Sequence, residues 1–411
     1  MSHSATLLQG AAARLSVLTG VHFLADFFSC LLPGFLPLLL RYFGLPLNVG
    51  ILVVAFIGTG ANLLQLPAAM LDRTVRSPRT LVIGLLLASL ILYIGLLPET
   101  TPAWALAILM LLIGSGVAIV HPHGLRGVQS IGTLSPTVST PAFMTGGFTG
   151  AAFAPWIASL LVGNFGMRGL LWLTIPLAAA LIGIRITGIR LAVEFPTPAA
   201  KEKPAKDISP WSFRNLFCIA LLMNIATTLY QYLLPTYLHG LGYELSFGGF
   251  CLMLFGAGSA VGSMALGAMI RRRNPAPFVL TGFAVGIPLT MLYFFFPRWG
   301  GSWLLSLGIG LLVSSEFPLL VSFARNVSGS GLGLGMRLAG IVGGTWGLAG
   351  VAFMGFGQLA DRIGLDRIMH FTWIFYLAAF CWALFSRRGG RSDGAQLLTR
   401  RRTAVFPRRR A

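Results

Sequence analysis

The sequence predicts an all-α integral membrane protein with twelve transmembrane helices, arranged as two parallel repeats of six. Three observations predict this fold class: a very apolar composition, apolar segments about as long as a bilayer is thick, and basic residues that gather on alternate loops. Hydrophobic residues make up 55% of the 411 residues and charged residues only 10%, and the mean hydropathy is +0.80. Soluble domains are about 25% charged, so this composition excludes an ordinary soluble enzyme.

The apolar segments give the helix count. A helix needs about 20 apolar residues to cross the hydrocarbon core of a bilayer. We expect the twelve transmembrane helices at residues 14–40, 48–71, 80–97, 103–123, 141–162, 168–190, 213–238, 246–270, 276–296, 301–324, 333–359 and 367–386. Strands that alternate polar and apolar residues, which a membrane β-barrel requires, do not occur in this sequence.

The positions of the basic residues test this count independently. The formal net charge of +19 would also suit a nucleic-acid binder, whose Lys and Arg form one face. If the N-terminus is cytoplasmic, 25 of the 30 Lys and Arg fall on the cytoplasmic side. The positive-inside rule expects such a bias. The sequence therefore predicts a multi-pass inner-membrane protein with both termini in the cytoplasm and no nucleic-acid partner.

A polar, Pro-rich linker at 191–212 divides the chain into two bundles, at 1–190 and 213–386. Shifting the sequence by 198 residues places all five glycines between Pro37 and Gly84 on glycines of the second half. This indicates an internal repeat. Six helices per repeat return the chain to the same side, so the repeats are parallel, an arrangement found in alternating-access carriers.

The segment 387–411 forms a basic cytoplasmic tail with nine Arg and one Asp. We expect a segment without fixed structure that stays near anionic lipid headgroups; a dedicated binding site is the alternative.

Two carboxylates fall within predicted membrane helices, Asp26 and Glu316. An ionisable group in the bilayer core costs about 2.5–3.5 kcal/mol on insertion scales, so each needs a reason to be there. His22 lies one helical turn before Asp26 on the same face, which predicts a pair able to exchange a proton. The alternative for Asp26 is an interhelical hydrogen bond. For Glu316, the alternative is that it satisfies backbone groups freed by Pro318.

Other polar residues in the predicted helices are candidates for a substrate path. His121 precedes Pro122 and is either a proton relay that lines a cavity or a cap on a kinked helix. Five further polar residues either line this path or form hydrogen bonds between helices. They are Asn62, Gln65, Asn224, Tyr230 and Gln231. The loop with Asp72, Arg73 and Arg76 is short enough to form ion pairs that hold one conformation, unless its arginines only fix orientation.

Several kinds of site are not expected. The chain has no GxxxxGK[ST], HExxH or GxSxG motif, so neither nucleotide-powered pumping nor hydrolysis is predicted. His121 and His123 do not share a helix face, and the four cysteines lie in apolar stretches. We therefore expect neither a metal nor a cofactor, and no enzymatic activity.

Several motifs together resemble the major facilitator superfamily and, within it, the bacterial fosmidomycin resistance protein family of efflux carriers. They are His22 to Asp26, Leu36-Pro37-Leu38-Leu39, Phe43-Gly44-Leu45, Gly114-Ser115-Gly116, His121-Pro122 and the segment from Gly357 to Gly364. The resemblance covers residues 14–386. It implies a reduced form of the antiporter pattern of helix five, in which Gly146, Gly147, Gly150 and Pro155 serve close helix packing.

The leading hypothesis is a monomeric secondary transporter that exports a small organic compound or drug by alternating access, coupled to protons through Asp26. An uptake symporter or facilitator on the same fold is the first alternative. A membrane scaffold or sensor that transports nothing is the second.

Overall fold

The computed structural model describes residues 2–71, 74–192, 210–270, 276–327, 337 and 340–404. Within these ranges the chain is helical and contains no strand. Among the described residues, eleven helices are long and apolar enough to cross a membrane, and counting the bent pair α2 and α3 as one span brings the number to twelve. The predicted all-α membrane fold with about twelve spans is confirmed.

The first half contains six spans. Their elements are α1 (Ser2–Ser29), η1 (Leu32–Gly34), α2 (Leu36–Tyr42), α3 (Leu47–Leu63), α4 (Gln65–Ala69), α5 (Arg79–Ala88), η2 (Ser89–Leu96), α6 (Ala103–Gln129), α7 (Pro136–Phe165), η3 (Met167–Leu173) and α8 (Thr174–Thr187).

The second half repeats this order. Its elements are α9 (Phe213–Gly240), α10 (Leu245–Ile270), α11 (Ala276–Phe295), α12 (Ser302–Leu312), η4 (Ser314–Glu316), α13 (Phe317–Val327), η5 (Gly340–Gly344), α15 (Thr345–Ile363) and α16 (Leu365–Ala404).

Several predicted helices are not continuous α-helices: the expected helix at 48–71 is interrupted at Leu64, and those at 80–97 and 168–190 include the 3₁₀ helices η2 and η3. Two further helices break near prolines. The expected helix at 14–40 ends at Ser29, passes through the 3₁₀ turn η1 and restarts as α2. Pro33 lies in that turn and has no N–H to continue an α-helix. The expected helix at 301–324 breaks at η4, directly before Pro318 in α13. The start of the expected helix at 333–359 lies outside the described residues.

The same helix contacts occur in both halves. In the first half α1 packs against α7 and α8, and α6 packs against α3 and α5. In the second half α9 packs against α15 and α16, and α12 packs against α10 and α11. Each of these four contacts of the second half therefore repeats one of the first.

Glycines allow a similar close approach at two of these crossings. A Cβ on Gly114 in α6 would overlap the carbonyl oxygen of Ile57 in α3, and a Cβ on Gly310 in α12 would overlap that of Phe255 in α10. Phe255 is the residue that the repeat aligns with Ile57. Small residues at such crossings let helix backbones approach closely, because lipid offers no hydrophobic drive for association.

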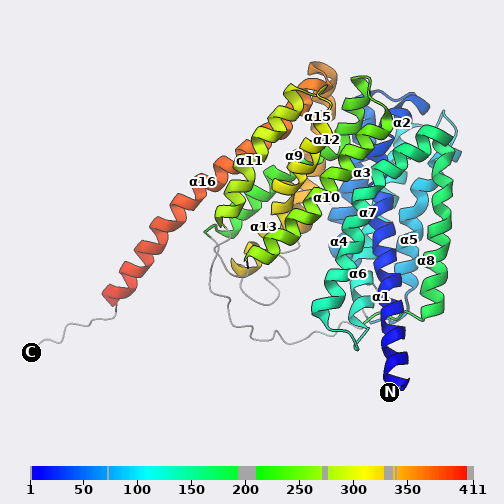
Figure 1. Ribbon diagram of the computed structural model, residues 1–411, viewed down its shortest axis with the longest axis horizontal. Helices are drawn as coiled ribbons and strands as arrows, with labels where there is room; N and C mark the ends of the chain where they lie inside the picture. Colours follow the sequence, from blue (N-terminus) through cyan, green and yellow to red (C-terminus); the bar gives the residue numbers. More distant parts are fainter. Residues whose placement is uncertain are drawn as a thin grey trace, which may run out of the picture.

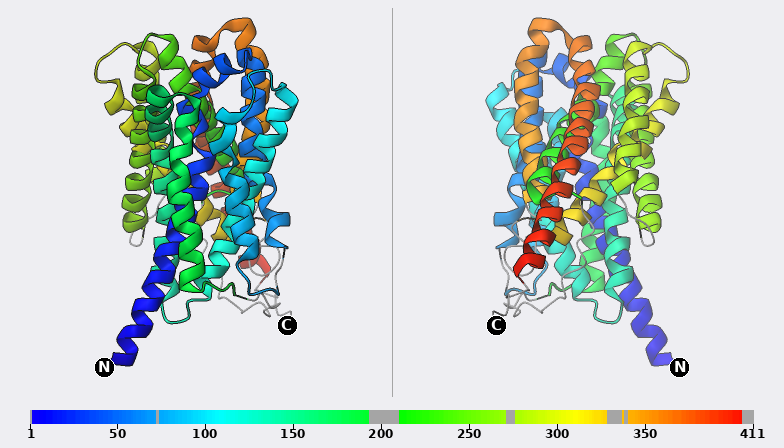
Figure 2. Two further views of the ribbon diagram at one scale, coloured as in Figure 1. Left: turned by 90° about the vertical axis from the view of Figure 1, so that its right-hand side faces the viewer. Right: turned by 90° about the vertical axis from the view of Figure 1, so that its left-hand side faces the viewer.

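The most extensive contacts between the two halves are those of two helix pairs, α3 with α15 and α7 with α10. Since α10 repeats α3 and α15 repeats α7, the two contacts are equivalent under the repeat. The start of α1 and the end of α16 lie at the same end of the molecule, where α11 and α16 lean away from the helices of the first half (Figures 1 and 2). A parallel repeat has this arrangement.

The linker and the tail are described in part. Residues 193–209 of the linker lie outside the described residues, as do Asp72 and Arg73. The backbone of α16 remains helical from the last span to Ala404, so the expectation of a tail without fixed structure is wrong as far as Ala404. A helix that already exists extends at little cost, because its nucleus has been formed in the span.

Candidate functional site

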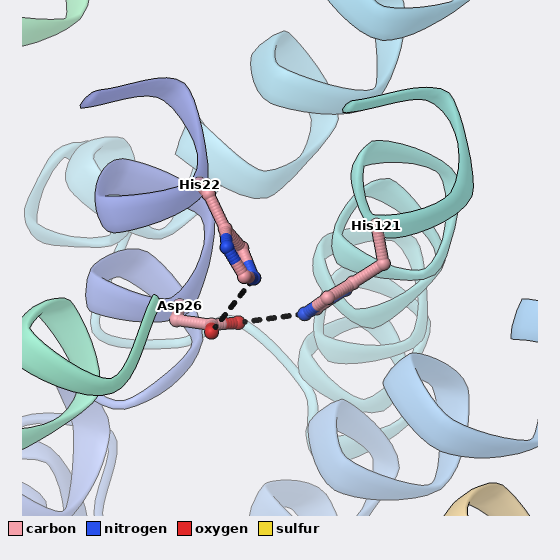
Figure 3. A group of neighbouring side chains, drawn as sticks. All are labelled: His22, Asp26 and His121. Carbon is pink, nitrogen blue, oxygen red and sulfur yellow. Dashed lines mark ion pairs between the residues drawn. The ribbon is translucent and has the colours of Figure 1, made fainter. Parts of the chain in front are cut away.

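Three ionisable side chains meet inside the first bundle (Figure 3). The carboxylate of Asp26 lies between two imidazoles: its Oδ1 is 3.1 Å from Nε2 of His121, and its Oδ2 is 3.4 Å from Nε2 of His22. His22 and Asp26 come from α1 and His121 from α6. We call these three residues the His–Asp–His cluster. The sequence predicted the His22–Asp26 pair but did not connect His121 to it.

Backbone hydrogen bonds fix which nitrogen of each ring faces Asp26. Nδ1 of His22 lies 2.8 Å from the carbonyl oxygen of Phe143, and Nδ1 of His121 lies 2.9 Å from that of Val117. A carbonyl oxygen only accepts, so each Nδ1 carries a hydrogen and donates it. Nε2 of each ring is therefore the atom that gains or loses a proton, and both Nε2 atoms face the same carboxylate.

This arrangement needs protons to be stable. Without a proton on either Nε2 or on Asp26, two nitrogen lone pairs would face the negatively charged carboxylate oxygens. A proton between Asp26 and His121 turns one of these contacts into a charge-assisted hydrogen bond. The contact to His22 is longer, and its buried Nε2 has no hydrogen-bond partner among the described residues. The position between Asp26 and His121 is thus the better site for the first proton.

The cluster is partly accessible. The side chains of Asp26 and His121 are 20% and 25% exposed, while that of His22 is 2% exposed. His22 stacks on the ring of Phe143, with 4.2 Å between the ring centroids. Asp26 and His121 are therefore the exposed side of the cluster, and His22 is enclosed by the protein.

Helix α7 closes the cluster on one side. A Cβ on Gly147 would overlap Oδ2 of Asp26 and the ring of His22, and Cβ atoms on Gly146 and Gly150 would overlap backbone carbonyl oxygens of α1. The glycines that the sequence assigned to the fifth transmembrane helix, which is α7, thus lie directly against α1, and Gly147 lies at the cluster itself. Pro155 lies at the other end of this contact, where its carbonyl group approaches both Gly34 and Gly249 of α10.

The cluster also has the composition of a cation site. One ligand atom from each of its three residues lies within 4.8 Å of the other two, which would suit a divalent metal. The contact between Asp26 and His121 meets hydrogen-bonding distance by itself, however, so a proton suffices to explain it. From the sequence, a metal site was weighed only at His121 and His123. In the structure, His123 contacts the backbone oxygens of Ile119 and Leu71.

Glu316 lies apart from the cluster, in the second bundle. Its side chain is buried and contacts α11, where a Cβ on Gly282 would overlap its Oε1. Its Oε2 has no hydrogen-bond partner in the described part of the chain. The structure therefore does not bring the two membrane carboxylates together.

Most of the remaining polar candidates form contacts between or within helices. Asn224 donates to Oγ1 of Thr345 at 2.8 Å, linking α9 to α15, and the Tyr230 hydroxyl lies 2.6 Å from that of Ser306, linking α9 to α12. Both are fully buried. Asn62 donates to its own helix at Gly58, and Gln65 and Gln231 are half-buried.

One structural residue was missed in the sequence. Arg126, at the end of α6, is 2% exposed and donates to the carbonyl oxygens of Val75 and Ala192. It joins the loop before α5 to the segment after α8. Arg76 lies exposed in that loop, and Asp72 and Arg73, its expected partners, lie outside the described residues. The sequence signal for this role was a single charge at the end of an apolar helix, and in the sequence this charge was interpreted only as one that orients the helix in the membrane.

Similar proteins are transporters. The chain is 24% identical over 364 residues to the MFS-type transporter YfnC of Bacillus subtilis, covering 85% of this chain and 86% of that protein. It is 23% identical over 376 residues to the fosmidomycin resistance protein of Escherichia coli, covering 89% and 90%. These relatives agree with the expectation that the chain is not an enzyme.

Solved structures have the same fold at lower identity. A bacterial homologue of the human lysosomal transporter Spinster, in an inward-facing and occupied conformation, matches with a TM-score of 0.67 and 16% identity, covering 91% of this chain and 96% of that one. A POT family transporter in complex with 5-aminolevulinic acid matches with a TM-score of 0.65 and 14% identity, covering 90% and 94%.

The sequence profile of the Major Facilitator Superfamily matches residues 18–350, which is most of the chain. Together with the twelve-span repeat fold and its transporter relatives, this match shows that the chain belongs to the Major Facilitator Superfamily of membrane transporters.

Proposed function

We propose that the protein is a proton-coupled secondary transporter that exports a small organic compound from the cytoplasm. In this proposal residues 1–190 and 213–386 are two rigid bundles joined by the linker at 191–212. They rock against each other so that a central site opens to one side of the membrane at a time.

The His–Asp–His cluster is the observation that supports proton coupling. A proton bound between Asp26 and His121 removes the net negative charge of the cluster, which lowers the cost of enclosing it away from water. When that proton leaves, the carboxylate regains its charge and favours the conformation in which water reaches it. The cluster thus binds a proton from one side of the membrane and releases it to the other.

Helix α7 connects the cluster to the contact between the bundles. On one face, Gly147 lies against Asp26 and His22. On the other, Ala152 and Pro155 lie against Gly256 and Gly249 of α10. Because these crossings leave no room for a side chain, a shift of α1 at the cluster has to move α7 with it. This supports a mechanical link between protonation and rocking.

The direction of transport is proposed from the name of one relative, and the position of the termini from the charge bias. One relative carries the name fosmidomycin resistance protein, and resistance by a membrane transporter requires removal of the compound. The charge bias of 25 basic residues to 5 supports cytoplasmic termini in an inner membrane. We further propose that the transporter acts as a monomer and that Glu316 is a second, separate proton-binding carboxylate.

Inside-out membrane vesicles test the proposal. A thermal-shift screen of small organic compounds on the purified protein, with fosmidomycin among them, first selects a compound that raises the melting temperature. Uptake of that compound is then measured with and without an acid-inside pH gradient. We expect accumulation that stops when the gradient is collapsed. Accumulation that persists without any gradient would contradict proton coupling, and uptake only in right-side-out vesicles would contradict export.

A further inference from the structure

We propose that the first bundle carries a binding site for one anionic phospholipid, in a groove between the start of α5 and the end of α8. The groove has a volume of about 760 Å³. It is separate from the His–Asp–His cluster and from the basic tail, and this inference does not depend on the proposed transport mechanism.

The charged part of the groove lies at the membrane surface. Four arginines line it: Arg76, Arg79, Arg185 and Arg190. Arg79 begins one apolar span and Arg185 lies in the last turn of another, so these side chains are at the depth of the headgroups. All four are exposed. Of the described residues that line the groove, none is acidic, so the groove presents a concentrated positive charge to an anion.

The apolar part of the groove continues into the bilayer. Its walls one or two turns inside the spans are Val82, Ile83, Leu181 and Ile184. Ile83 is 53% exposed, and Ile182 and Ile186 of α8 are 57% and 78% exposed. Apolar side chains so exposed on a membrane helix face lipid tails. A ligand that fits both parts has a negative head and an aliphatic tail, which describes an anionic phospholipid.

The walls of the groove are held in place by hydrogen bonds to backbone carbonyl oxygens. Arg126 donates to Val75 and Ala192 and so joins the two segments that carry the arginines. The N–H of Leu191 donates to the carbonyl oxygen of Arg76 at 2.9 Å, and the Ser130 hydroxyl donates to that of Arg190 at 2.6 Å. Arg14 of α1 donates to Thr187 at the end of α8. A site formed before the ligand arrives loses less entropy on binding.

Gly188 gives the segment its turn. Its φ of 60° lies in the left-handed region, where it ends α8 and directs Ile189 and Arg190 back over the groove. Guanidinium groups form paired hydrogen bonds with phosphate oxygens. The groove therefore recognises the phosphate of the headgroup, and it disfavours headgroups such as choline that bring a positive charge next to the arginines.

The test uses the purified full-length protein in a neutral detergent. Dioleoyl phosphatidylglycerol or dioleoyl phosphatidylcholine is titrated in, bound lipid is counted by native mass spectrometry, and the melting temperature is measured. We expect one tightly bound phosphatidylglycerol, with the Arg79→Gln/Arg185→Gln protein binding it at least tenfold more weakly. Arg41→Gln and Arg168→Gln serve as matched controls, because these exposed arginines lie in α2 and η3 of the same bundle, away from the groove. We expect each control to change the lipid affinity less than twofold.

Several results would overturn the inference. Equal binding of the two lipids, or an equal loss in the control variants, would indicate general attraction to the membrane surface. Stabilisation by inorganic phosphate or glycerol 1-phosphate at the same concentration would indicate a site for a soluble anion. If the double variant is unstable in detergent alone, Arg76→Gln and Arg190→Gln are measured singly, and unchanged lipid affinity in both contradicts the site.

Discussion

Nε2 of His121 in α6 lies 3.1 Å from Oδ1 of Asp26 in α1, and this contact joins two helices that are distant in the sequence. The pair is completed by His22, one turn before Asp26 on α1. Because both imidazoles use Nδ1 to bind backbone oxygens, they have only Nε2 left for the shared carboxylate. The proposed proton coupling rests on this contact.

Asp26→Asn should separate transport from proton coupling. The amide keeps the size of the carboxylate but does not take up a proton, so the cluster loses its charge change. We expect accumulation driven by a pH gradient to fall about tenfold or more, which corresponds to about 1.4 kcal/mol, while exchange of labelled for unlabelled compound continues. Asp366→Asn is the matched control, since Asp366 accepts a hydrogen bond from Tyr237 away from the cluster. Equal losses in both variants would contradict the assignment.

His121→Gln and His22→Gln should differ from each other. His121 is partly exposed and closest to Asp26, so its replacement should reduce the dependence of transport on the pH gradient. His22 is buried against Phe143, so its replacement should mainly lower the melting temperature. Transport as a function of pH and thermal unfolding are measured for both proteins. A His121 variant with normal gradient dependence would show that the hydrogen bond to Asp26 is only structural.

Gly147→Ala should disrupt the cluster. The new Cβ would overlap Asp26 and His22, and overpacking of this kind costs about 1–3 kcal/mol. We expect a lower melting temperature and a loss of gradient-driven transport. Gly163→Ala is the matched control on the same helix, because nothing lies within 4 Å of a Cβ there. A fully active Gly147→Ala protein would mean that α7 yields at this crossing.

Glu316→Gln should have a smaller effect on coupling than Asp26→Asn. The amide has the same size, and Glu316 contacts the glycine surface of α11 instead of an imidazole. We therefore expect gradient-driven accumulation to change by less than about threefold, which corresponds to under about 1 kcal/mol. Vesicle uptake of the same compound measures it. A loss as large as that of Asp26→Asn would make Glu316 an equal partner in proton transfer.

Tyr230→Phe should reduce stability and leave coupling unchanged. Its hydroxyl forms a buried hydrogen bond to Ser306 between α9 and α12, and such bonds in membrane proteins contribute about 1 kcal/mol. Thermal unfolding should therefore shift downward by a few degrees. Tyr93→Phe, at a tyrosine that is 40% exposed, should show no shift. Altered gradient dependence in Tyr230→Phe would instead place this hydroxyl on the transport path.

Much of the fold was accessible from the sequence. Apolar length gave the spans, the loop charges gave their orientation as a prediction, and glycines repeated at a constant shift gave the two halves. These signals survive in a single sequence because the bilayer imposes the same length and polarity on every span. The interruptions at η1 and η4 were less predictable, since a proline in a membrane helix is compatible with a kink, a break or neither.

The sequence by itself determined that Asp26 needs a partner and offered His22, because residues four apart share a helix face. Only the tertiary structure decided that His121 joins them, that Glu316 does not, and that Asn224 and Tyr230 bond to neighbouring helices. The physical reason is that helix periodicity relates residues within one helix, whereas the rotation of one helix against another depends on packing at glycines such as Gly147 of α7, which lies against α1, and Gly124 of α6, which lies against Phe143 of α7. Those crossings bring α1, α6 and α7 together around one carboxylate.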